Sequence, residues 1–137
     1  MKHWVNAALA LLLTACSLHA SSPEPREADS AAQSWLALVD AGDYAKSWNE
    51  AAANFRNSIA QAEWVSRVSA RRGLLGAVKS RQESSARFTR SLPGAPDGEY
   101  VVIQFRTTFE HKATATETVT PMKGTDGIWR VSGYYIR

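Results

Sequence analysis

Residues 99–109 constrain the fold more than any other segment, because they form a long run rich in β-branched and aromatic side chains. In an extended chain, alternate side chains point to opposite sides. One side here carries Val101, Ile103, Phe105, Thr107 and Phe109, whereas the other carries Tyr100, Val102, Gln104, Arg106 and Thr108. We therefore expect the central strand of a sheet, with its odd-numbered residues facing the core.

A helical period precedes this strand. Apolar residues recur every three or four positions over residues 28–41, 44–55 and 58–73, and each of these segments contains a tryptophan that we expect in the core (Trp35, Trp48 and Trp64). Gly42 ends the first stripe, and the third stops near Gly73. The pattern predicts three helices before the sheet.

Three more segments alternate as strands do: the second half of residues 77–92, residues 113–120 and residues 129–135. Turn-forming residues separate the strands at 93–98 and 124–127. The order predicts an α+β domain over residues 28–137, in which three N-terminal helices pack on one face of a four-stranded antiparallel meander.

The first residues have the features of an export signal. Lys2 precedes a short apolar run, and Leu13-Thr14-Ala15-Cys16 resembles the lipobox of bacterial lipoproteins, in which the cysteine is lipidated. We predict a leader over residues 1–15, a lipid on Cys16 and a flexible, proline-containing tether over residues 16–27. The alternative is cleavage after Ala20. Both predict export, either to the periplasm or as a lipoprotein of the outer membrane, which Ser17 favours by resemblance.

The sequence lacks the residues that several kinds of catalytic and metal-binding site require. Cys16 is the only cysteine, and His111 is the only histidine after residue 27, so a disulfide within the chain, a Cys-His nucleophile and a His/Cys zinc site are excluded. We expect no metal, no cofactor and no catalytic residue. The net charge of +3 does not point to nucleic acid. Residues 56–90 are basic and suit an anionic surface; alternatively, they lie against the acidic residues 24–55 or face solvent.

Three stretches resemble the signatures of a known family in their order and spacing: Leu-Pro-Gly-Ala-Pro-Asp-Gly-Glu-Tyr at 92–100, Glu-Thr-Val-Thr at 117–120 and Asp-Gly-Ile-Trp-Arg-Val-Ser-Gly-Tyr-Tyr at 126–135. The family is the domain of unknown function 4019 family of small exported bacterial proteins. The resemblance covers about residues 30–137 and includes Trp64 with Arg71, Arg72 and Gly73. It implies a cystatin-like or NTF2-like cone with no assigned activity.

Glu117 is the one chemically unusual position, because its odd number places a carboxylate on the inward face of its strand. If Val119 pairs with Val131, Glu117 faces Gly133; a shift of two residues keeps the face and changes the partner. A buried carboxylate costs several kcal/mol, to order of magnitude, unless it is paired.

Arg71 or Arg72, at the end of the third helix, is the partner that we expect. Three interpretations of Glu117 follow. It forms a structural ion pair, or it lies at the base of a small-ligand pocket lined by Arg72, Trp64 and Tyr135, or it acts as a general acid or base. The last lacks a second inward-facing carboxylate or histidine.

The outward face of the meander is rich in threonine and carries exposed aromatic residues. It is a solvated face, or a partner surface centred on Tyr100, Arg106 and Tyr134. Taken together, the sequence favours a non-enzymatic, exported envelope domain with an accessory or binding role, attached to a membrane through Cys16. The alternatives are a ligand-binding or hydrolase-like pocket that uses Glu117, and a subunit of an envelope assembly.

Overall fold

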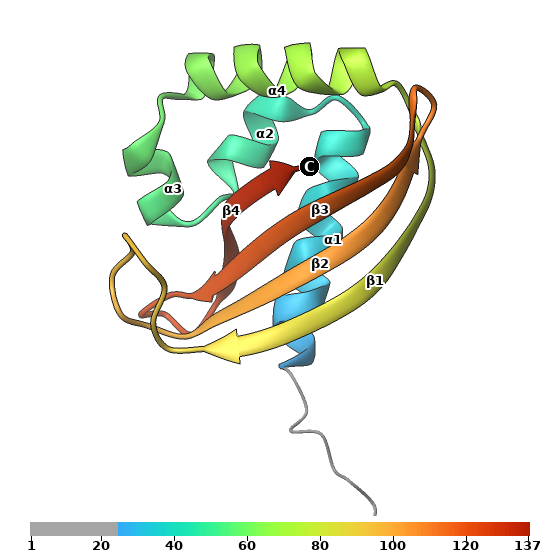
Figure 1. Ribbon diagram of the computed structural model, residues 1–137. Helices are drawn as coiled ribbons and strands as arrows, with labels where there is room; N and C mark the ends of the chain where they lie inside the picture. The colour runs from blue at the N-terminus through green and yellow to red at the C-terminus, as the bar shows by residue number, and fades with distance from the viewer. Residues whose placement is uncertain (1–24) are drawn as a thin grey trace, which may run out of the picture.

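The computed structural model describes residues 25–137 (Figure 1). The predicted leader and Cys16 lie outside these residues, as does most of the predicted tether. Four helices, α1 (Arg26–Asp40), α2 (Tyr44–Asn49), α3 (Ala53–Ser58) and α4 (Gln61–Leu75), precede four strands, β1 (Val78–Thr89), β2 (Tyr100–Phe109), β3 (Lys112–Lys123) and β4 (Trp129–Ile136). The α+β class is as predicted, but α1 begins two residues before the predicted domain boundary.

The prediction of three helices was wrong, because the second predicted helix is two short ones. The chain is extended at Ala52, with φ −61° and ψ 153°, where α2 and α3 are separated. The backbone N–H of Ala52 donates a hydrogen bond of 2.8 Å to the carbonyl oxygen of Val131 in β4. A bond to the sheet thus replaces the bond that would have continued the helix.

The third predicted helix, α4, runs past Gly73 to Leu75. Gly76 ends it instead, with φ +76° and a backbone N–H that donates to the carbonyl oxygen of Arg72 at 2.9 Å. This positive φ favours glycine, so the helix terminates at the second of the two glycines.

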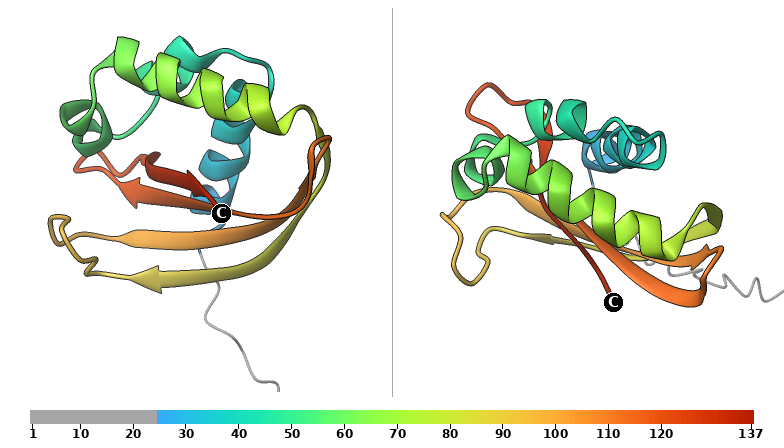
Figure 2. Two further views of the ribbon diagram at one scale, coloured as in Figure 1. Left: turned by 45° about the horizontal axis from the view of Figure 1, so that its top comes forward. Right: turned by 90° about the horizontal axis from the view of Figure 1, so that it is seen from above.

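The strands form one antiparallel sheet in the order β1-β2-β3-β4 (Figure 2). The odd-numbered residues of β2 are buried, as predicted. β1 is longer than predicted, since it occupies most of residues 77–92 and not only their second half. Its register against β2 shifts between Glu83 and Ser85.

The predicted pairing of Val119 with Val131 was wrong. Val119 pairs with Tyr134, and Glu117 pairs with Ile136. The register shifts between Thr120 and Pro121, because Ser132 of β4 is an extra residue at this point. A bulge of one residue moves the following side chains to the other face.

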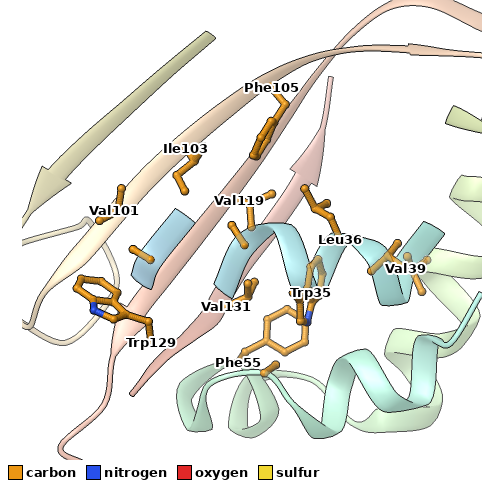
Figure 3. Packing of buried hydrophobic residues seen from close by; sticks show 14 of the residues in the cluster. Trp35, Leu36, Val39, Phe55, Val101, Ile103, Phe105, Val119, Trp129 and Val131 are labelled. Carbon is orange, nitrogen blue, oxygen red and sulfur yellow. The ribbon is translucent and has the colours of Figure 1, made fainter. Parts of the chain in front are cut away.

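The helices lie on the concave side of the sheet, which curls around them (Figures 1 and 2). α1 crosses the sheet and packs against β3 and β4. Its Trp35, Leu36 and Val39 belong to an apolar cluster that also includes residues of β2 (Figure 3). A smaller apolar cluster at one end joins Leu75, Phe109 and Ala115. Among residues 25–137, no helix has the length and apolar character needed to span a bilayer.

Candidate functional site

The carboxylate of Glu117 lies inside the domain with no exposed surface. Oε1 accepts hydrogen bonds from Arg81 Nε at 2.8 Å and from Thr107 Oγ1 at 2.5 Å. Oε2 accepts hydrogen bonds from Arg81 Nη2 at 3.2 Å and from the hydroxyl of Tyr134. Each carboxylate oxygen therefore accepts two hydrogen bonds, which is the full capacity of its lone pairs.

Two further charges extend this arrangement toward the helices. Asp40, the last residue of α1, accepts hydrogen bonds from Arg81 Nη1 at 2.7 Å and Nη2 at 3.0 Å. It also accepts one from Arg72 Nη2 of α4 at 2.8 Å. Two arginines and two carboxylates thus neutralise one another. We call Asp40, Arg72, Arg81, Thr107, Glu117 and Tyr134 the ion-pair network; its six members come from α1, α4 and all four strands.

Arg72 is the least satisfied member. Its side chain is only 6% exposed, and Nε and Nη1 have no hydrogen-bond partner among the described residues. Its guanidinium carbon lies 5.2 Å from the centre of the Phe109 ring, over the ring face. This cation–π contact offsets part of the cost of burying the N–H groups.

Burial and the neighbouring charges shift the pKa values of Asp40, Arg81 and Tyr134. Burial alone raises the pKa of Asp40, but hydrogen bonds from Arg81 and Arg72 outweigh burial and hold this pKa below the ordinary value. Burial likewise disfavours the charged form of Arg81, yet Asp40 and Glu117 together raise the pKa of Arg81. Burial, and then the adjacent charge of Glu117, raise the pKa of Tyr134. Asp40 is thus held as the anion, and Tyr134 as the neutral phenol that donates to Glu117.

Aromatic rings fill the space beside the network. The ring of Tyr134 packs 5.2 Å from Trp35 and 6.5 Å from Trp64, measured between centroids. Phe55 packs edge-on against Trp64 at 5.0 Å. The indole N–H groups are satisfied by buried Ser47, whose carbonyl oxygen accepts from Trp35 at 2.8 Å and whose Oγ accepts from Trp64 at 3.0 Å. The junction between helices and sheet is therefore packed with side chains at this point.

The structure brings together part of the predicted pocket. Glu117, Arg72 and Trp64 are buried near one another, with Arg72 joined to Glu117 through Asp40 and Arg81. Arg71 points to solvent, and Tyr135 is 48% exposed. The β4 bulge is the reason, because it turns Tyr134 inward in place of Tyr135.

The predicted partner of Glu117 needs correction, since Arg81 and not Arg71 or Arg72 contacts its carboxylate. Arg81 does not follow from the sequence pattern, because the alternation predicts a strand only over the second half of this segment and the bulge after Glu83 interrupts it. Asp40 does have a signal in the sequence. Asp40 lies four residues after Leu36 and directly after Val39, which places it beside the apolar stripe of α1.

The three residues of the predicted partner surface do not form one exposed surface. Arg106 is exposed on the outer side of the sheet. Tyr100 is fully buried, and its hydroxyl donates to the carbonyl oxygen of Pro96 at 2.5 Å, beneath the loop that precedes β2. Tyr134 belongs to the ion-pair network.

A surface hollow of about 670 Å³ lies away from the network, between α3, residues 97–99 and the β3–β4 turn. Its charged side chains are largely paired with each other. Lys123 lies 3.7 Å from Glu99, and Arg130 lies 2.9 Å from Asp126. Within residues 25–137, no group of three or more histidine, cysteine or acidic side chains is placed to hold a metal ion.

The sequence of the chain matches one known protein family. Residues 31–134 match the family described as "Protein of unknown function (DUF4019)". The chain belongs to the DUF4019 family. The matched range runs from the first turns of α1 to Tyr134 in β4, so the family signature spans almost the whole folded domain. No curated protein matches the chain.

Proposed function

We propose that this DUF4019 protein is a non-enzymatic, exported domain with an accessory or binding role in the cell envelope, attached to a membrane through a lipid on Cys16. The observation that supports a non-enzymatic role is the state of Glu117. Its carboxylate has no exposed surface, and both oxygens are fully occupied by Arg81, Thr107 and Tyr134.

A general acid or base must come within hydrogen-bond reach of the proton that it transfers. A substrate would reach Glu117 only after displacing Tyr134 and the tryptophans packed on it. The geometry instead favours the first interpretation of this residue, a structural ion pair that holds the helices on the sheet. We further propose that the curled sheet around α1 is a cone of the cystatin-like or NTF2-like kind.

The membrane attachment rests on the lipobox sequence and is tested by fractionation. We expect the wild-type protein in the membrane fraction and the Cys16→Ser variant in the soluble periplasmic fraction. The matched control is Ser21→Ala, which changes a nearby residue and leaves the lipobox intact, so it should stay with the membrane. The same distribution for wild type and Cys16→Ser would contradict the anchor.

A further inference from the structure

We infer that the helix-free face of the sheet docks on the anionic phospholipid headgroups of the membrane that holds the anchor. The inference rests on the proposed lipid at Cys16. We call this surface the open face; it consists of the strand residues that point away from the helices (Figures 1 and 2).

The outward strand positions of the open face carry basic side chains and no acidic ones. Cross-strand register aligns Gln82, Arg106 and Thr116 across β1, β2 and β3. The backbone of Thr116 exchanges two hydrogen bonds with Arg137, the residue that follows β4, which continues this row beyond β3. Arg87 lies on the same face, opposite Val102. The outward strand positions that flank these three arginines hold threonine, serine, glutamine, tyrosine, valine and glycine, and no acid.

These arginines are available to an anionic partner. Arg87, Arg106 and Arg137 are exposed, and the salt bridges within the described residues involve none of them. Arg130, at the end of the face, is different because it is paired with Asp126. These three side chains carry three formal positive charges, against a formal net charge of +3 for the whole chain.

An aromatic side chain accompanies the charges. Tyr135 is 48% exposed on the open face, and the guanidinium of Arg137 lies 5.3 Å from the centre of its ring. Tyrosine combines a polar hydroxyl with an apolar ring, which suits the boundary between lipid headgroups and acyl chains. The same bulge that turns Tyr134 into the core therefore gives the open face its aromatic group.

The length of chain between the anchor and the fold permits this orientation. Nine peptide units separate Cys16 from Pro25, and a chain of that length spans at most about 30 Å. α1 begins beside the β3–β4 turn, where Arg26 and Glu27 lie near Ile128 and Trp129. The chain must pass from the helix layer to the open face, a distance of about 10 Å between packed layers. The anchor also keeps the domain near the lipid surface, so a weak attraction is enough to orient it.

Each arginine near an anionic membrane surface strengthens binding by about fivefold. Removal of three should therefore weaken binding by about a hundredfold. The attraction should fall steeply with added salt, since the Debye length is only about 8 Å at physiological ionic strength.

The test uses the full exported chain with Cys16→Ser, so that binding reports the folded surface and not the lipid. Cosedimentation is measured with vesicles of phosphatidylcholine alone and of phosphatidylcholine mixed with phosphatidylglycerol. We expect binding only to the mixed vesicles, weakened about a hundredfold by the triple change Arg87→Gln, Arg106→Gln and Arg137→Gln. The matched control changes Arg56, Arg67 and Arg71 to Gln, which removes the same charge from the helical side and should weaken binding far less.

Circular dichroism confirms that both triple variants remain folded. Equal weakening by the two triple variants would overturn the inference, because it would assign the attraction to net charge and not to the open face. Absence of binding to the mixed vesicles would overturn it as well. Mass spectrometry of the N-terminal peptide of the wild-type protein tests the anchor separately, so failure of the anchor and failure of the docking face are distinguishable.

Discussion

Replacement of Glu117 by glutamine should destabilise the domain strongly while preserving the shape of the side chain. Glutamine keeps one acceptor oxygen and places an NH₂ group where the other oxygen stood. Whichever way the amide is oriented, an arginine N–H then faces the NH₂ group, and the hydroxyl bonded at the same position must turn from donor to acceptor. Asp40 also becomes the only carboxylate bonded to Arg72 and Arg81, so an uncompensated positive charge stays in a mostly buried site.

The magnitude follows from breaking a buried ion pair, which costs about 3–5 kcal/mol. For a domain of this size, each kcal/mol lowers the melting temperature by about 4 °C, so we expect Glu117→Gln to melt about 12–20 °C lower. The assay is thermal unfolding followed by circular dichroism. The matched control is Glu50→Gln, an exposed acid 3.9 Å from Lys46, which should change the free energy of unfolding by less than about 0.5 kcal/mol. A Glu117→Gln variant that melts like the wild type refutes the structural role of the network.

Two further predictions concern pH and the end of α4. The pKa of Asp40 is lowered in the fold, so its stabilising contribution should be complete above about pH 5 and decline as the pH falls below about 4. The pKa of Tyr134 is raised, mainly by burial, so stability should decline as the pH rises above about 10. Burial also raises the pKa of Tyr100, so Tyr134→Phe should make this alkaline decline smaller without removing it, and an unchanged decline would argue against the role of Tyr134. Gly76→Ala should destabilise by about 1–3 kcal/mol, because φ is +76° and a Cβ would lie 2.8 Å from that of Glu110, whereas Gly73→Ala has open space and should stabilise the helix by up to about 1 kcal/mol. Chemical denaturation measures both, and equal effects of the two alanines would contradict the assigned end of α4.

The periodicity of apolar residues in the sequence predicts those helices and strands in which that period is not interrupted. The odd-numbered residues of β2 and the inward position of Glu117 follow directly from alternation, as does the meander from its turn residues. The sequence pattern does not predict where a bulge or a helix break interrupts this periodicity. The register shift at Ser132 moved Tyr134 inward and Tyr135 outward, and no local signal announces it. The break between α2 and α3 depends on a hydrogen bond from Ala52 to β4, which is a tertiary interaction.

In the candidate site, too, some features follow from the sequence and others depend on tertiary contacts. Sequence reasoning identified the buried acid and its need for a cation, because both follow from the cost of burying charge. It could not choose among the arginines, since the choice depends on which strands lie together. Arg81 reaches Glu117 from β1, two strands away in the sheet order, and at the same time reaches Asp40 at the end of α1. Only the folded chain brings these three residues within hydrogen-bond distance.

The most direct test of the account is the coupling free energy between Glu117 and Arg81. Unfolding free energies are measured for the wild type, Glu117→Gln, Arg81→Gln and the double variant. If the buried pair ties β1 to β3, the double variant should be more stable than the sum of the single effects predicts, by about 2 kcal/mol or more. Single effects that add to within about 0.5 kcal/mol would show that the two side chains act independently, and would contradict the central role given to the ion-pair network.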